Sequence, residues 1–188
     1  MTPQELIGIL SVAEKLKCTT RHCDTSTGRR ESVAEHSWRL CLFALLVADE
    51  FPDTDMNKVI RMCMIHDLGE AFTGDIATFN KTDAHIKTEE DSFSQWVASF
   101  PAPQKEEFSA LLREMNEMKT PEAMLYKALD KLEAVIQHNE SDISTWLPLE
   151  YDLQLTYGRE NVGFSPYLLK LKEYIDEWTK RKISEEGK

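Results

Sequence analysis

The 188-residue sequence contains few glycines and prolines and has no long hydrophobic run. Seven glycines and seven prolines are too few for a collagen-like or low-complexity chain. The longest apolar stretch, Leu40–Ala48, is about half of the roughly 18–20 residues that a membrane-spanning helix needs. We therefore expect a globular protein that has no membrane among its partners.

Positive charge is also scarce. Lysine and arginine number 22 against 33 aspartates and glutamates, which gives a formal net charge of −11. Polymers of nucleic acid favour proteins with clustered Lys and Arg, so we expect no nucleic-acid polymer as a partner. A small anionic substrate would need a local group of basic residues or a metal ion to overcome the overall negative field.

The four cysteines predict neither a disulfide framework nor a zinc site. Cys41 and Cys63 lie in apolar helical patterns typical of buried free thiols, and Cys18 and Cys23 have no second cysteine pair. The N-terminal stretch Met1–Leu16 is amphipathic and charged, unlike a signal peptide. Reduced thiols without a signal peptide predict a cytoplasmic protein.

Helical periodicity runs through most of the chain and predicts an all-α fold. No segment alternates with a period of two, so Cys18–Arg30 is expected to be a polar loop. We expect about seven to eight helices in a bundle of one domain, residues 1–183, followed by a charged tail, residues 184–188. The expected helices are residues 3–17, 32–50, 55–71, 82–100, 104–118, 121–139, 144–157 and 166–183.

Two histidines lie in apolar helical patterns where a ligand role has to be weighed against simple packing. His36 shares the inward stripe of Val33 and Leu40, and alone it would be read as a hydrogen-bonded core histidine. His66 and Asp67 follow a continuous apolar run. A buried carboxylate is costly unless it is paired with a cation or bound to a metal, so Asp67 indicates an ion pair or a metal ligand.

Further carboxylates follow at helical spacing. Glu70 comes four residues after His66 and lies on the same helix face, and Asp75 comes directly after the expected end of that helix. Asp130 lies among apolar residues of a later helix, where it could equally face solvent. His22, His85 and His138 have no partner at ligand spacing and are expected at the surface.

Together, His36, His66, Asp67 and Asp130 offer two imidazoles and two carboxylates from three helices. This set suits one divalent transition-metal ion, Mn²⁺, Co²⁺, Fe²⁺, Ni²⁺ or Zn²⁺. Such an ion lowers the pKa of bound water and polarises a phosphoryl oxygen. Glu70 or Asp75 could then orient the attacking water or donate a proton to the leaving oxygen.

Three segments resemble the motifs of the HD-domain superfamily of metal-dependent phosphohydrolases, and in particular its 5′-deoxynucleotidase group. They are residues 31–37, 66–76 and 127–133, and the second is the most specific. The resemblance implies an HD-domain helical bundle with a motif core at about residues 30–140 and C-terminal helices in residues 144–183. It also implies a homodimer that hydrolyses (deoxy)ribonucleoside 5′-monophosphates.

The same resemblance implies a role for each candidate residue. The metal ligands would be His36, His66, Asp67 and Asp130. Glu70 would activate water, and Asp75 would protonate the leaving group. A basic residue ahead of the first histidine contacts the phosphate in that group, and the candidates, each of which could also be a solvated loop residue, are Arg21, Arg29 and Arg30.

Other functions stay open at this point. Hydrolases of guanosine polyphosphates usually carry an acid directly after the position of Glu70, where this chain has Ala71, and the Gly-Tyr-Pro signature of cyclic-dinucleotide phosphodiesterases is absent. A di-iron oxygenase would need further histidines between Asp67 and Asp130, where only His85 occurs. A helical binding module with a structural metal is the non-enzymatic alternative, although it would not need Glu70 and Asp75.

Overall fold

The computed structural model describes residues 1–187 and confirms the all-α fold. Its helices are α1 (Pro3–Ala13), α2 (Val33–Leu46), α3 (Met56–Ile65), α4 (Glu70–Thr73), α5 (Asp83–Ala98), α6 (Gln104–Glu117), α7 (Pro121–Glu140), α8 (Glu150–Thr156) and α9 (Pro166–Glu186). Within residues 1–187, no helix is long and apolar enough to cross a membrane.

The helices begin where the sequence offers capping side chains. The Ser32 hydroxyl accepts a hydrogen bond from the Glu35 backbone N–H, and the Glu35 carboxylate accepts one from the Ser32 N–H, so the predicted capping box is present. At the start of α7 the Thr120 hydroxyl accepts a hydrogen bond from the Ala123 backbone N–H, and Pro121 occupies the first helical position. These caps set the starts of α2 and α7, the two helices that carry the candidate ligands His36 and Asp130.

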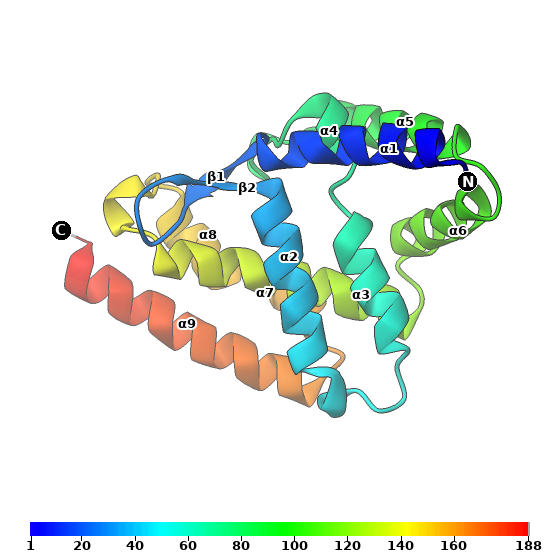
Figure 1. The fold of residues 1–188 in the computed structure, drawn as a ribbon. Helices are drawn as coiled ribbons and strands as arrows, with labels where there is room; N and C mark the ends of the chain where they lie inside the picture. The colour runs from blue at the N-terminus through cyan, green and yellow to red at the C-terminus, as the bar shows by residue number, and fades with distance from the viewer. Residues whose placement is uncertain (188) are drawn as a thin grey trace.

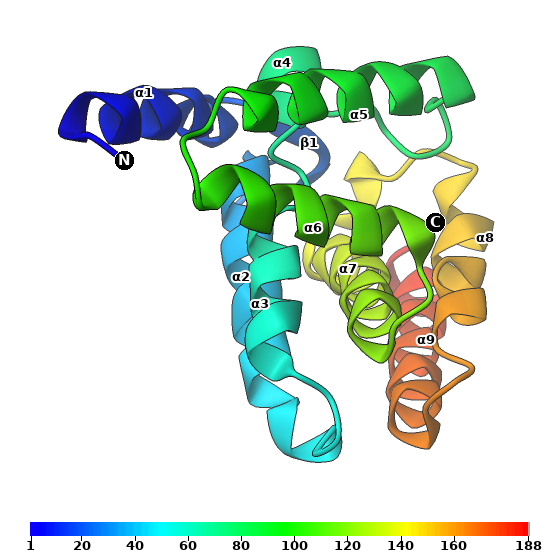
Figure 2. The same cartoon turned by 90° about the vertical axis from the view of Figure 1, so that its right-hand side faces the viewer.

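Helices α2 and α3 lie side by side, and α7 packs against both (Figures 1 and 2). Helices α1, α4 and α5 lie across one end of this group, and α9 runs along α7 on the other side. The shared core is apolar and fully buried. It includes Leu40 and Ala44 of α2, Val59 and Met62 of α3, and Leu125 and Leu129 of α7. This packing brings together three segments that are distant in the sequence.

The predicted loop at residues 18–30 is in part a β-hairpin, which corrects the sequence-based expectation. Strands β1 (Thr20–Asp24) and β2 (Arg30–Ser32) pair antiparallel, with Gly28 at a φ of 80° in the turn between them. Strands of five and three residues are too short and too polar to show a clear alternation. The hairpin is fastened to α7 by the Gln137 side-chain amide, which donates to the Asp24 carbonyl oxygen at 2.8 Å.

The helix predicted over residues 55–71 is broken, and the break falls at the candidate ligands. Helix α3 ends at Ile65, and the chain continues through tight turns in which backbone N–H groups bond to carbonyls three residues earlier. Gly69 lies in this segment because α5 approaches closely: a Cβ there would stand 2.9 Å from the Glu89 side chain. The break therefore places His66 and Asp67 in the turns between α3 and α4 rather than within a helix.

The C-terminal part also differs from the prediction. The helix expected over residues 144–157 is shortened to α8, which begins only after Pro148. Helix α9 continues to Glu186, so most of the expected charged tail is helical, and Lys188 lies outside the described residues.

Candidate metal centre

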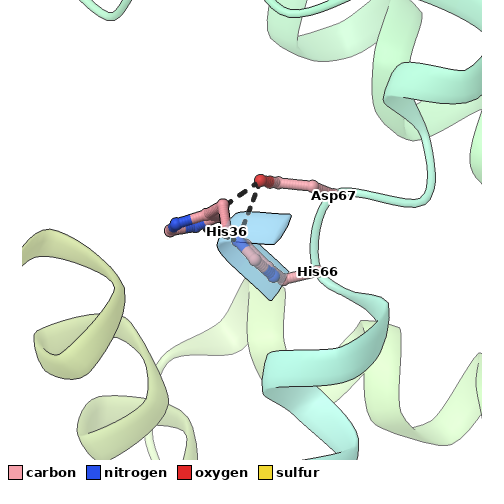
Figure 3. Close-up of side chains that lie close together, drawn as sticks. All are labelled: His36, His66 and Asp67. Carbon is pink, nitrogen blue, oxygen red and sulfur yellow. Dashed lines mark hydrogen bonds and ion pairs between the residues drawn. The ribbon is translucent and has the colours of Figure 1, made fainter. Parts of the chain in front are cut away.

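Four side chains from three parts of the fold meet between α2, α3 and α7. Figure 3 shows three of them, His36 from α2 with His66 and Asp67 from the break after α3, pointing toward one another. His66 Nε2 lies 3.0 Å from Asp67 Oδ2 and 3.2 Å from His36 Nε2. Asp130 of α7 places Oδ1 at 3.3 Å from His36 Nε2 and 3.6 Å from His66 Nε2. All four predicted metal ligands are therefore adjacent.

The spacing and chemistry of these atoms fit a shared cation. Ligand atoms bound to one ion at ~2.0–2.2 Å stand roughly 3–3.5 Å apart. The Nδ1 atoms of both rings are occupied on the far side, His36 by Glu133 and His66 by the Cys63 carbonyl oxygen at 2.9 Å. In the neutral form that binds a metal, each ring would donate from Nδ1 and offer its Nε2 lone pair to the ion. Two nitrogen and two oxygen donors suit a divalent transition-metal ion.

Oppositely charged side chains lie side by side in this cluster and shift one another's pKa values. Burial alone would raise the pKa of Asp67 and Asp130, but His66 beside Asp67 and Lys127 beside Asp130 hold both pKa values below the ordinary range. Burial opposes protonation of His66, yet the neighbouring Asp67 and Asp130 raise its pKa to about 10. A metal ion must displace that proton in order to bind, so metal affinity should increase with pH.

Two further carboxyl groups lie beside the cluster. Glu70 is buried at the start of α4, and its Oε2 has no hydrogen-bond partner among residues 1–187. Burial, together with Asp67, Asp75 and Glu89, raises the pKa of Glu70 to about 10. Burial also raises the pKa of the half-buried Asp75. An unpartnered acid oxygen of this kind is free to bind water or a substrate.

A cavity of about 440 Å³ opens onto the candidate ligands, a size that suits a small molecule. Its walls carry His66, Asp67, Asp130, Glu70 and Asp75. Four basic side chains face the same space, namely Arg21, Lys81, Lys127 and Lys131. Acidic side chains outnumber these basic ones in the lining, so an anionic substrate would need a metal ion as well as the basic groups.

The hairpin separates the three candidate phosphate-binding arginines. Arg21 on β1 points inward, lines the cavity and is held by Glu31 at 3.2 Å. Arg29 lies in the turn and pairs with Glu35, with 60% of its side chain exposed. Arg30 pairs with Asp24 at 3.4 Å and is half-exposed. Over the described residues 1–187, only Arg21 of these three lines the cavity.

Sequence reasoning missed several residues of this site. Glu133, the partner of His36, lies three residues after Asp130 on one face of α7, and that spacing is a signal that could have identified it. The expectation that His22 and His138 are surface residues is wrong: both line the cavity, and both contact Glu150, at 3.5 and 3.0 Å. No local pattern signals these two contacts, because Glu150 reaches them through the tertiary fold.

Comparison with known proteins gives consistent matches. A family model described as HD domain matches residues 13–172. Human 5′-deoxynucleotidase HDDC2 is 30% identical over 115 residues, which cover 60% of this chain and 55% of the human protein. The chain thus spans little more than half the length of that relative. The 5′-deoxynucleotidase hdd1 of Schizosaccharomyces pombe is 28% identical over 159 residues, 75% of this chain and 79% of the yeast protein.

A solved structure shares nearly the whole fold. It is a predicted metal-dependent phosphohydrolase from Magnetospirillum magnetotacticum, with a TM-score of 0.80 and 26% identity. The alignment covers 95% of this chain and 93% of that protein. The helical arrangement around the candidate metal centre is therefore shared with a protein of that name.

The raised pKa of Glu70 predicts how stability depends on pH. Folding raises its pKa from 4.5 to about 10, so its contribution to stability is fully present below pH 4.5 and is lost as the pH rises toward 10. Glu70→Gln keeps a neutral group at every pH. The metal-free variant should match the wild type at about pH 4 and exceed its free energy of unfolding by about 1 kcal/mol or more at about pH 8, measured by urea denaturation.

The exposed Glu173 of α9 provides the control, because Glu173→Gln should leave the wild-type pH dependence unchanged. If the free energy of unfolding of Glu70→Gln differed from that of the wild type by the same amount at both pH values, folding would not raise the pKa of Glu70.

Proposed function

The chain belongs to the HD-domain family, and on that premise we propose that it is a metal-dependent phosphohydrolase of nucleoside 5′-monophosphates. The names of the human and yeast relatives favour deoxyribonucleotides as substrates. One observation carries the proposal: the Nε2 atoms of His36 and His66 each lie within 3.0–3.8 Å of carboxylate oxygens of both Asp67 and Asp130, beside a cavity that also holds the unpartnered carboxylate oxygen of Glu70.

In the proposed mechanism, His36, His66, Asp67 and Asp130 hold the divalent ion. That ion, when bound, supplies Lewis acidity toward a phosphoryl oxygen and toward water. Glu70 would accept the proton of the attacking water through its unpartnered Oε2. A cation held by the four ligands would favour the ionised form of Glu70, against the raised pKa that burial gives it.

The remaining groups act on the phosphate and on the leaving oxygen. Arg21 pairs with the phosphate, a role that its position in the cavity favours over Arg29 and Arg30. We assign proton donation to the leaving 5′ oxygen to Asp75, because its carboxyl group lines the cavity and burial raises its pKa above the ordinary value. Water and substrate would enter through the cavity that these residues line.

Phosphate release tests this proposal directly. We expect hydrolysis of nucleoside 5′-monophosphates in the presence of Mn²⁺, Co²⁺, Fe²⁺, Ni²⁺ or Zn²⁺, and loss of both metal and activity in Asp67→Ala, because a ligand is removed. The assay should include 3′- and cyclic monophosphates and guanosine polyphosphates. Hydrolysis confined to these would identify a phosphodiesterase or signalling-nucleotide hydrolase, and a folded, metal-loaded but inert protein would identify a binding module.

Glu70→Gln separates water activation from metal binding. The variant should keep its metal content and lose roughly 10²–10⁴-fold in kcat, the usual contribution of general acid–base catalysis. Metal content is measured by elemental analysis, and kcat by phosphate release at saturating substrate. Glu173→Gln is the matched control. Wild-type turnover in Glu70→Gln would remove this residue from the mechanism.

We also propose that the protein is a cytoplasmic homodimer. All four cysteines are free thiols, which agrees with a reducing compartment. Helix α2 leaves an apolar stripe at helical spacing uncovered, namely Trp38, Leu42 and Leu45. Exposed apolar patches of this kind often mark protein–protein contacts.

Oligomeric state tests the role of this stripe. Leu45→Glu should shift the protein from dimer to monomer in sedimentation velocity, because a charge would be buried in the contact. Tyr174→Glu, on the exposed face of α9, should leave the dimer intact. A monomeric wild type would exclude the homodimer, and a dimeric Leu45→Glu would place the contact elsewhere.

A further inference from the structure

We propose that Glu133 is a positioning residue that couples the metal centre to Arg21, the candidate phosphate-binding side chain. The inference rests on the proposed function and concerns a residue to which the proposed mechanism gives no part. Glu133 lies on α7 one turn after Asp130, and its side chain is 1% exposed. It therefore has no direct access to a substrate and can act only through its neighbours.

Three donors converge on this one carboxylate. Oε2 accepts from His36 Nδ1 and lies 3.5 Å from an Arg21 guanidinium nitrogen. Oε1 accepts from Arg39 Nε at 2.6 Å, and Arg39 also bonds to Glu140. The carboxylate is thus held at both oxygens, so that it presents Oε2 to His36 and Arg21 in a fixed orientation.

The contact with His36 sets how that ring can bind a metal. Because Nδ1 donates to Glu133, the lone pair of the ring is on Nε2, the atom that faces His66 and Asp130. A carboxylate behind a histidine ligand fixes its tautomer and orientation and increases its basicity. Removing the negative charge should therefore weaken metal binding even though every ligand remains.

The contact of Glu133 with Arg21 concerns the phosphate-binding part of the site rather than the metal ligands. Arg21 is held between Glu133 at 3.5 Å and Glu31 at 3.2 Å, and Glu31 is also bonded by the Cys23 thiol at 3.2 Å. Within residues 1–187, no hydrogen bond or ion pair joins Glu31 to a candidate metal ligand. Glu31 therefore holds Arg21 and accepts from the Cys23 thiol, whereas Glu133 holds both Arg21 and His36.

Conservative variants can separate these roles. Glu133→Gln keeps the shape but replaces one acceptor oxygen by an NH₂ donor, which must face His36 and Arg21 or else Arg39, all of them donors. Glu31→Gln disturbs Arg21 and the Cys23 thiol, but no hydrogen bond of a candidate metal ligand. Glu140→Gln, the matched control, disturbs only the outer partner of Arg39.

The test is calorimetric titration of Mn²⁺ into the metal-free proteins, followed by titration of inorganic phosphate into the Mn²⁺-saturated proteins. We expect Glu133→Gln to raise the Kd of Mn²⁺ by about 10–100-fold, the usual cost of losing such a partner, and to raise the Kd of phosphate as well. Glu31→Gln should raise only the Kd of phosphate. Glu140→Gln should change neither.

Thermal unfolding, followed by circular dichroism, establishes that all variants are folded at the titration temperature. A Glu133→Gln protein with a lowered Tm but wild-type Kd values would overturn the proposal, because its role would then be structural only. If Glu133→Gln does not fold, Glu133→Asp replaces it: the withdrawn carboxylate should still weaken Mn²⁺ binding, and wild-type affinity would again overturn the proposal. A wild type that binds no Mn²⁺, or binds it as tightly after Asp67→Ala, would overturn the metal centre and this inference together.

Discussion

Burial of several acidic groups at one point between α2, α3 and α7 is the constraint on which the site depends. Each of these carboxylates needs a positive partner in the interior, and most have one. Lys127 pairs with Asp130, Arg39 with Glu133, and Lys81 with Glu89. Glu70 is different: its nearest cation, Lys81, is 4.0 Å away and is bound more closely by Glu89. A proton or a metal ion must therefore neutralise the negative charge of Glu70. At this site the fold is less stable than a fully paired interior would be, and the unpaired carboxyl group is available for catalysis.

The backbone accommodates that constraint by departing from regular helix. If α3 continued past Ile65, His66 and Asp67 would point about 100° apart around one axis and could share an ion only at the edge between their faces. Helix α3 instead ends at Ile65, and the side chains of His66 and Asp67 in the turns that follow point toward one another (Figure 3). These turns depend on the missing side chain of Gly69 beside α5. The β-hairpin adds the second departure, since it directs Arg21 inward while Arg29 and Arg30 remain at its exposed end.

These departures mark the limit of what could be predicted from the sequence. Periodicity and capping residues predicted the helices well, because Ser32–Glu35 and Thr120–Pro121 act within one turn. The four candidate ligands were also predicted, because each stands out as a polar group in an apolar pattern. The hairpin and the break at residue 65 were not, because short polar strands and tight turns leave no periodic signal. Glu133 was overlooked for a different reason: its spacing from Asp130 places it on the same helix face, but this spacing does not show its partner His36, which lies 97 residues away.

If Glu133 has the proposed role, the two halves of the site cannot be independent. A cation on His36 Nε2 withdraws electrons from the ring and makes Nδ1–H a stronger donor to Glu133. The carboxylate then carries less charge for Arg21, whose contact with it, at 3.5 Å, is already the longest of the three. Arg21 would stay positioned by Glu133 and Glu31 but would be held less strongly, and so would be more available to an incoming phosphate when the metal is in place. Glu133→Gln, by contrast, would remove the positioning itself. By linkage, a phosphate that draws Arg21 away returns the full carboxylate to His36 and strengthens metal binding by the same factor. A single buried carboxylate would thus make phosphate binding and metal binding mutually supportive, although it touches neither ligand.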